Sequence, residues 1–131
     1  MRVLLDTHVW IWCRAEPDRL SGRVRRIIES PRTAVYFSAA SAWELAIKSD
    51  AGRLRLPESP EQVLSASLEE DRFEELPIRL RHALMTTTLP PLHGDPFDRL
   101  LIAQARCERL TLVTADERVL AYGGPVTDAR A

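Results

Sequence analysis

The chain has 131 residues, of which 45% are hydrophobic, and its formal net charge is -1 at pH 7. This length and apolar content are those of one domain with one core, so we expect a single domain over residues 1–131. The balanced charge excludes a global basic field, although it does not exclude a local patch that binds nucleic acid. No apolar run approaches the ~18 residues of a membrane helix, and the apolar N-terminal stretch is interrupted by Asp6 and His8, unlike a signal peptide. We therefore expect a cytoplasmic protein with no membrane span.

The cysteines and histidines form no known disulfide or metal pattern. Cys13 and Cys107 lie far apart in apolar surroundings, which predicts small buried side chains in a reducing compartment rather than a disulfide. The spacing of His8, His82 and His93 matches no zinc signature. We therefore expect the three histidines to be structural or to lie at the rim of a site.

Strands and helices are predicted to alternate along the whole chain. Short apolar runs predict buried strands at residues 3–5, 34–37, 73–77 and 110–113, with an edge strand at 126–127. Helical periodicity and capping residues predict helices at residues 7–14, 38–50, 78–85, 96–109 and 115–121, with two more that begin near Ser21 and Ser59. Such alternation predicts a three-layer α/β/α sandwich around a central, mainly parallel sheet.

Four acidic residues occupy positions where α/β sheets form their sites. Sites in open α/β sheets lie beyond the carboxyl ends of the strands. Asp6 directly follows the first predicted strand, and Asp116 lies shortly after the fourth. Glu44 and Asp98 lie near the start of predicted helices next to the sheet. We expect all four carboxylates to face the same edge.

Three of these acids also have purely structural interpretations. Asp6 and Asp116 are suited to cap the helices that follow them. Ser41 and Glu44 have the spacing of a capping box, and Glu44 and Lys48 have the spacing of a favourable helical ion pair. Asp6 is the hardest to explain in this way alone, because a carboxylate that closes a buried strand is costly to desolvate.

The stretch HGDPFDRLL, residues 93–101, raises the same question for the fourth acid. Asp95 followed by Pro96 fits the N-cap and first position of a helix, and this places Asp98 in the first turn. A helix N-terminus favours a negative side chain, but it also favours a bound phosphate. The local sequence therefore allows both a capping role and a ligand role for Asp98.

Taken together, the four acids predict metal-assisted chemistry. Carboxylates crowded at one edge repel one another and cannot all stay ionised unless a cation neutralises them. Oxygen ligands without a Cys or His cluster suit Mg²⁺ or Mn²⁺. Such an ion polarises a phosphoryl oxygen and lowers the pKa of bound water. The pattern therefore predicts hydrolysis of a phosphodiester by water, without a covalent enzyme intermediate.

Four sequence blocks resemble those of a known family. LLDTHVW, SAASAWELAIK, HGDPFDRLLIAQA and LVTADERV are similar, in order and spacing, to the motif blocks of the PIN domain, and more narrowly of VapC-type ribonuclease toxins of type II toxin–antitoxin pairs. The resemblance spans residues 2 to about 127. It implies a Mg²⁺-dependent endoribonuclease with an RNA substrate. It also implies a homodimer and a cognate antitoxin that wraps a hydrophobic groove and covers the acidic site.

The resemblance also implies roles for individual residues. Asp6 and Asp98 match the main ligands of Mg²⁺ (or Mn²⁺). Glu44 and Asp116 match the acids that complete the catalytic pocket, through waters or a second ion. The position of Asp116 is the most variable of the four in the family.

Three neighbouring residues are supporting candidates. Thr7 and Thr114 match small hydroxyl positions beside the first and fourth acids, where they would orient a ligand or a water, or cap a helix. Arg99 follows Asp98 directly and is suited to pair with an acid or to contact a phosphate.

Partner contacts need exposed apolar surface. Trp10, Trp12, Val63 and Leu64 are candidates for it, although tryptophans at helical spacing also belong in cores.

Two other classes of function fit part of the pattern. A signalling domain that accepts a phosphoryl group on an aspartate also gathers acids around Mg²⁺. It needs a lysine late in the chain, but the only lysine is Lys48. A catalytically idle PIN-like scaffold that only binds partners would not need all four acids.

Overall fold

The computed structural model describes residues 1–131 and contains one five-stranded sheet with the strand order β3-β2-β1-β4-β5. All four strand pairings are parallel. The strands are β1 (Arg2–Leu5), β2 (Ala34–Ser38), β3 (Glu74–Leu76), β4 (Thr111–Thr114) and β5 (Val126–Asp128). The predicted parallel sheet is confirmed, and the short run near residue 126 is a parallel edge strand.

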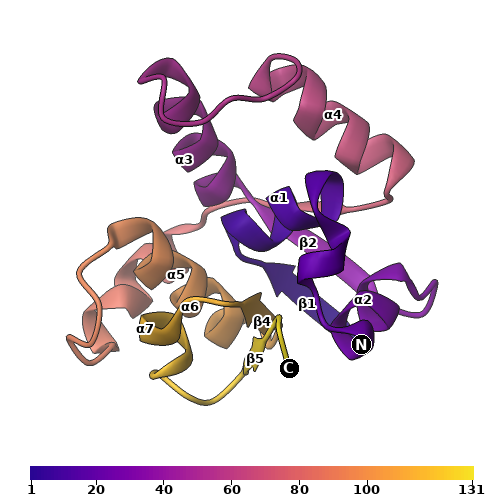
Figure 1. Cartoon of the computed structure of the whole chain (residues 1–131). Coiled ribbons are helices and arrows are strands. Elements are labelled where there is room, and N and C mark those ends of the chain that lie inside the picture. The colour runs from indigo at the N-terminus through magenta and orange to yellow at the C-terminus, as the bar shows by residue number, and fades with distance from the viewer.

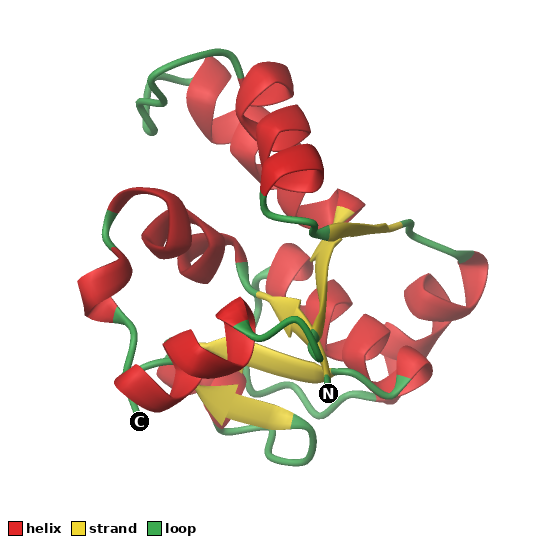
Figure 2. Ribbon diagram, turned by 90° about the vertical axis from the view of Figure 1, so that its right-hand side faces the viewer, coloured by secondary structure: helices red, strands yellow, loops and turns green.

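Seven α-helices connect and cover the strands (Figures 1 and 2). They are α1 (Thr7–Ala15), α2 (Gly22–Glu29), α3 (Ala39–Asp50), α4 (Pro60–Glu70), α5 (Leu80–Met85), α6 (Pro96–Glu108) and α7 (Glu117–Leu120). Two 3₁₀ turns, η1 (Pro17–Arg19) and η2 (Thr86–Thr88), complete the elements. None of these helices combines the length and the apolar character that crossing a membrane requires.

The sheet separates two apolar clusters, because successive side chains of a strand point to opposite faces. Val3 and Leu5 of β1 belong to one cluster, together with residues of α1, α2 and α4. Leu4, between them, belongs to the other cluster, together with residues of α6 and α7. The three-layer α/β/α sandwich predicted from the sequence is therefore confirmed.

The order of the strands creates a switch point beside β1. The chain runs outward from β1 through β2 to β3, and then returns to place β4 on the other side of β1. Connections on the two sides of such a point diverge, and ligands bind in the crevice at the carboxyl ends of the strands there. Asp6 directly follows β1, and its backbone N–H donates to Val113 O at 3.0 Å, which extends the ladder to β4.

Local capping explains where most helices begin. Ser21 and Ser59 accept hydrogen bonds from the backbone N–H of residues three positions later, as predicted from the sequence. The predicted capping box of Ser41 and Glu44 is wrong, because Ser38 at the end of β2 is the N-cap and Ser41 lies inside α3. Glu44 is therefore free of a capping role.

Three of the four residues expected to supply apolar partner surface do not supply it, and the fourth, Leu64, is partly buried against the core. Trp10, Trp12 and Val63 are buried in the core cluster. The indole of Trp10 packs on Phe37 and donates to Ser67 Oγ at 2.9 Å. Amphipathic spacing alone could not show that the α4 segment covers this face of the sheet. The most exposed large apolar side chains are instead Trp43 of α3 and Leu80 and Leu84 of α5.

The two cysteines are free thiols and are partly buried. Burial raises the pKa of Cys13 to about 12, and the carboxylates of Asp71 and Glu29 add to this effect. A thiol with such a pKa stays protonated and unreactive near neutral pH. Cys13 therefore serves packing, as its apolar surroundings in the sequence predicted.

Candidate active site

Both carboxylate oxygens of Asp6 accept hydrogen bonds at the ends of β1 and β4. Its Oδ1 accepts from the backbone N–H of Thr7 at 2.7 Å, and its Oδ2 accepts from the Thr114 hydroxyl at 2.7 Å. The side chain is almost completely buried, and desolvation raises the pKa of Asp6 despite the opposing effects of His8 and these hydrogen bonds. Capping α1 and facing the site are thus compatible roles of one carboxylate.

Thr114 and Thr7 support this arrangement in different ways. The Thr114 hydroxyl donates to Asp6 and accepts from the backbone N–H of Asp116 at 3.1 Å, so it links two of the four acids. The Thr7 hydroxyl is buried and makes no hydrogen bond. A buried hydroxyl without a hydrogen-bond partner is unusual. The Thr7 hydroxyl is therefore available to bind a ligand or a water at this edge of the sheet.

Asp98 lies in the first turn of α6, which begins at Pro96. Asp95 caps this helix, because its Oδ1 accepts from the backbone N–H groups of Phe97 and Asp98 at 2.8 and 3.2 Å. The side chain of Asp98 is therefore not needed for capping, and it is 9% exposed. Desolvation, followed by the charges of Asp6 and Asp95, raises the pKa of Asp98 to about 7.

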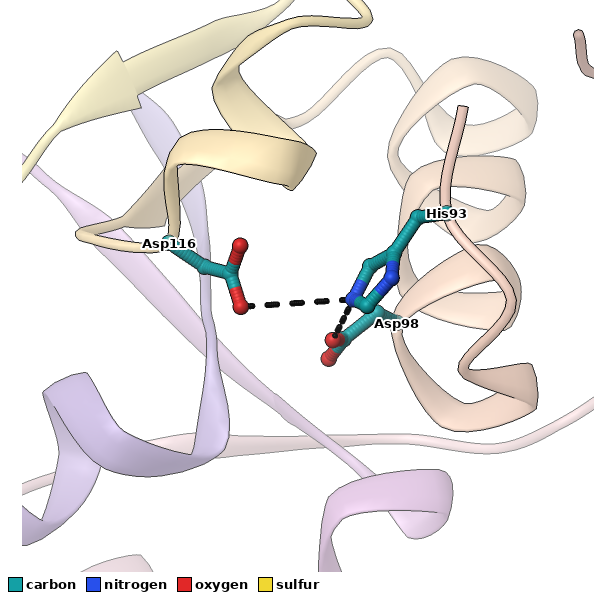
Figure 3. Close-up of side chains that lie close together, drawn as sticks. All are labelled: His93, Asp98 and Asp116. Carbon is teal, nitrogen blue, oxygen red and sulfur yellow. Dashed lines mark hydrogen bonds and ion pairs between the residues drawn. The ribbon is translucent and has the colours of Figure 1, made fainter. Parts of the chain in front are cut away.

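His93 is the unexpected member of the site (Figure 3). Its Nε2 lies 2.7 Å from Asp98 Oδ2 and 4.0 Å from Asp116 Oδ2. His93, Asp98 and Asp116 offer ligand atoms that lie within 4.8 Å of one another. The expectation that the histidines are structural or peripheral missed this position. The signal that could have found it is the nearness of His93 to Asp98 in the sequence.

Asp116 combines capping with a place in the cleft. Its Oδ1 accepts from the backbone N–H groups of Arg118 and Val119 at 2.8 and 3.4 Å, so Asp116 is the N-cap of α7. Its other oxygen faces His93. The predicted helix at residues 115–121 is shortened to Glu117–Leu120 because this cap sets its start.

Glu44 projects from the second turn of α3 and is buried. Lys48, one turn later, places its Nζ 3.2 Å from Glu44 Oε2, so the predicted helical ion pair is present. The charge of Glu44 contributes to the raised pKa of both Asp6 and Asp98. The carboxylate is therefore electrostatically coupled to the other acids, although its direct partner is a lysine.

One cleft of about 340 Å³ brings all four acids together. Asp6, Glu44, Asp98 and Asp116 all contribute to its wall, together with His93 and Thr7. Lys48 and Arg53 supply positive charge on the same wall. The arrangement suits a divalent cation with a phosphate beside it, because buried like charges with raised pKa values need neutralisation.

Arg99 does not pair with any of these acids. Its guanidinium donates to backbone carbonyls of the 86–93 segment and to the Tyr122 hydroxyl. The expectation that Arg99 pairs with an acid is therefore wrong, because carbonyls and a hydroxyl are its partners. Contact of Arg99 with a phosphate stays a prediction.

A family model described as "PIN domain" matches residues 3–125. The chain is also 36% identical over 124 residues to Ribonuclease VapC22 of Mycobacterium tuberculosis, which covers 94% of this chain and 93% of that protein. The chain belongs to the PIN domain family. The resemblance seen in the sequence is therefore confirmed.

Solved structures support the same fold for this PIN domain. VapBC2 from Rickettsia felis, bound to a DNA fragment from the promoter, matches with a TM-score of 0.70 at 19% identity over 93% of both chains. FitAcB from Neisseria gonorrhoeae matches with a TM-score of 0.62 at 24% identity over 98% of both chains. A toxin–antitoxin complex from Klebsiella pneumoniae matches with a TM-score of 0.63 at 19% identity over 97% of both chains.

Proposed function

We propose that this PIN domain is a Mg²⁺-dependent endoribonuclease and the toxin of a type II toxin–antitoxin pair. The observation that carries the proposal is the convergence of four carboxylates, from four separate elements, in one cleft at the switch point of the sheet. The relative named Ribonuclease VapC22 supports RNA as the substrate. Residues 1–131 act together as one nuclease domain in this proposal.

The residues present fit a divalent cation. The donor set is dominated by carboxylate oxygens, which suit Mg²⁺ or Mn²⁺. Asp6 and Asp98 are buried and have raised pKa values, so a cation would relieve their desolvation and mutual repulsion. In this proposal Asp6 and Asp98 are the metal ligands, and Glu44 and Asp116 complete the site.

The bound cation would supply polarisation of the scissile phosphate and a water of lowered pKa. The protein's own contribution is positioning. Thr114 and the backbone of Thr7 hold both oxygens of Asp6 before any ligand binds, so no reorganisation is needed at that carboxylate. Arg53, on the wall of the cleft, is placed to contact the RNA backbone.

The structural relatives support an antitoxin partner for this chain, since one of them is described as a toxin–antitoxin complex and another as VapBC2. Trp43, Leu80 and Leu84 are exposed by 62%, 77% and 60%, and they offer apolar surface for a protein contact or for a homodimer. An RNA substrate and a cognate antitoxin place the protein in the cytoplasm in this proposal.

The test is cleavage of a panel of structured and unstructured RNAs by purified, antitoxin-free protein. We expect cleavage with Mg²⁺ or Mn²⁺, none in EDTA, and a loss of at least about 10³-fold for Asp6→Asn, since a catalytic ligand is removed. Asp18→Asn is the matched control, because the Asp18 side chain is 99% exposed and contacts only Arg25. Metal-independent cleavage, or full activity of a folded Asp6→Asn protein, would contradict the proposal. Toxicity that persists in Asp6→Asn would favour the scaffold interpretation instead.

A further inference from the structure

The loop that carries His93 is fastened to α6 by one guanidinium. Arg99 Nη1 donates to Pro90 O at 3.1 Å and to His93 O at 3.4 Å, and its Nη2 donates to Thr86 O at 2.9 Å and to Leu89 O at 3.4 Å. The planar fork of arginine can serve this many acceptors, whereas an ammonium group cannot. The path of residues 86–93 is therefore set by a side chain that touches no acid.

Tyr122 contacts both Arg99 and the backbone of His93. Its hydroxyl accepts from Arg99 Nη1 at 3.0 Å and from the backbone N–H of His93 at 3.1 Å. Arg99 and Tyr122 thus bind both the N–H and the C=O of His93. The backbone position from which the imidazole enters the cleft is held at both ends.

One ring nitrogen of His93 has a hydrogen-bond partner and the other has none. The His93 side chain is 8% exposed, and its Nε2 lies 2.7 Å from Asp98 Oδ2. Its Nδ1 is buried and makes no hydrogen bond. With no acceptor at Nδ1, the hydrogen of the neutral ring belongs on Nε2, where it is donated to the carboxylate of Asp98. This bond uses one oxygen of Asp98 and leaves the other without a hydrogen bond.

We propose that His93, fastened by Arg99 and Tyr122, is a positioning residue that orients Asp98 and thereby sets the affinity of the site for a divalent cation. The inference rests on the proposed function, since it requires a cation at the acids. Hydrogen-bonding partners behind a metal ligand typically contribute 10–100-fold to metal affinity. His93 has that relation to Asp98.

The lack of a hydrogen-bond partner at Nδ1 argues against His93 as a direct ligand of the cation. A cation on Nε2 would force the ring hydrogen onto Nδ1, where no acceptor waits. Histidines that ligate metals ordinarily donate their second N–H to a carboxylate, a carbonyl or water. When His93 donates from Nε2 to Asp98, Nδ1 carries no hydrogen and needs no acceptor.

The test measures Mn²⁺ binding directly, by the electron paramagnetic resonance of free Mn²⁺, with the full chain and without RNA. His93→Phe keeps a ring and removes the donor, so its Kd is expected to rise 10–100-fold. His93→Gln restores an N–H near the Nε2 position, and its Kd is expected within about threefold of the wild type. An unchanged Kd in His93→Phe, or an equal loss in both variants, would overturn the inference.

Arg99→Lys tests the fastening without touching the cleft. Its Kd for Mn²⁺ is expected to rise about tenfold, because lysine cannot serve the five acceptors. Arg106→Lys is the matched control on the same helix, since Arg106 reaches only one carbonyl, that of Tyr122, at 3.5 Å. Equal Kd values for Arg99→Lys and wild type would refute the role of Arg99.

Two further measurements separate this inference from the proposed function. If both His93→Phe and Asp98→Asn bind Mn²⁺ like the wild type, the proposed metal site itself is wrong. If Asp98→Asn loses binding and His93→Phe does not, the metal site stands and the role of His93 is refuted. Nitrogen-15 NMR of the histidine rings needs no variant. A hydrogen that stays on Nε2 of His93 when Mg²⁺ is added supports positioning, and its loss from Nε2 overturns it.

Discussion

Asp98→Asn is expected to stabilise the metal-free protein near neutral pH while it abolishes metal binding. The carboxyl group of Asp98 is buried beside Asp6, which raises its pKa from 3.8 to about 7. An amide occupies the same space and carries no charge. Its oxygen still accepts from Nε2 of His93, so the 2.7 Å contact is retained.

The size of the effect follows from the shift in pKa. A rise from 3.8 to about 7 corresponds to about 4 kcal/mol at about 1.4 kcal/mol for each unit. The loss of a negative charge from the first turn of α6 offsets about 0.3–1 kcal/mol of this gain. Relaxation of the neighbouring acids offsets more of it. We therefore expect Asp98→Asn to raise the free energy of unfolding by about 2–3 kcal/mol at pH 8.

The pH dependence independently checks the sign of the stability difference between Asp98→Asn and the wild type. Between pH 3.8 and about 7 the unfolded chain has released the Asp98 proton while the native protein still holds it, so wild-type stability falls as pH rises. The advantage of Asp98→Asn should therefore be near zero at pH 4, grow through this window and level off above pH 7.

Urea denaturation in EDTA at several pH values measures this difference. Asp128→Asn is a control of opposite sign, because hydrogen bonds from Arg130 lower the pKa of Asp128, so its removal should cost stability at pH 8. Equal stability of Asp98→Asn and wild type at pH 8, or a difference that does not change with pH, would refute the electrostatic account of the site.

Three further outcomes are expected. Thr114→Val removes the 2.7 Å bond to buried Asp6 and should lower both Mn²⁺ affinity and the free energy of unfolding, the latter by about 1–3 kcal/mol in urea; unchanged stability would contradict the role of this bond. Arg81 and His82 hold the pKa of Glu108 below its usual value, so Glu108→Gln should lose stability at pH 7, and the loss should fade as pH falls through that pKa in an acid titration. Mg²⁺ at 100 times its Kd should raise the free energy of unfolding of the wild type by about 2.7 kcal/mol and therefore raise its melting temperature. EDTA should reverse the shift, and no shift would argue against a metal site.

The alternation of apolar runs and capped helices was enough to predict the architecture. Val3, Leu4 and Leu5 form a run that only a doubly covered strand can bury, and Asp95 with Pro96 marks the start of α6. These are short-range properties, set by backbone hydrogen bonding and side-chain periodicity within a few residues. For the same reason, Asp6 and Asp116 could be placed at the carboxyl ends of strands before any contact was known.

Contacts between distant segments could not be predicted in this way. Whether Trp10 lies in the core or on the surface depends on α4, which covers it from more than fifty positions away. The partners of Arg99 are backbone carbonyls, which carry no signature in the sequence.

By itself, the sequence determined that this is an α/β protein of the PIN family with four acids at strand and helix termini, because those features depend on local pattern. Only the tertiary structure decided that the four acids share one cleft and that His93 stands among them. The physical reason is that burial, and with it the raised pKa of Asp98, arises from the packing of β1, β4 and α6 against each other. Proximity in space, rather than in the chain, turns a capped helix start into a candidate metal site.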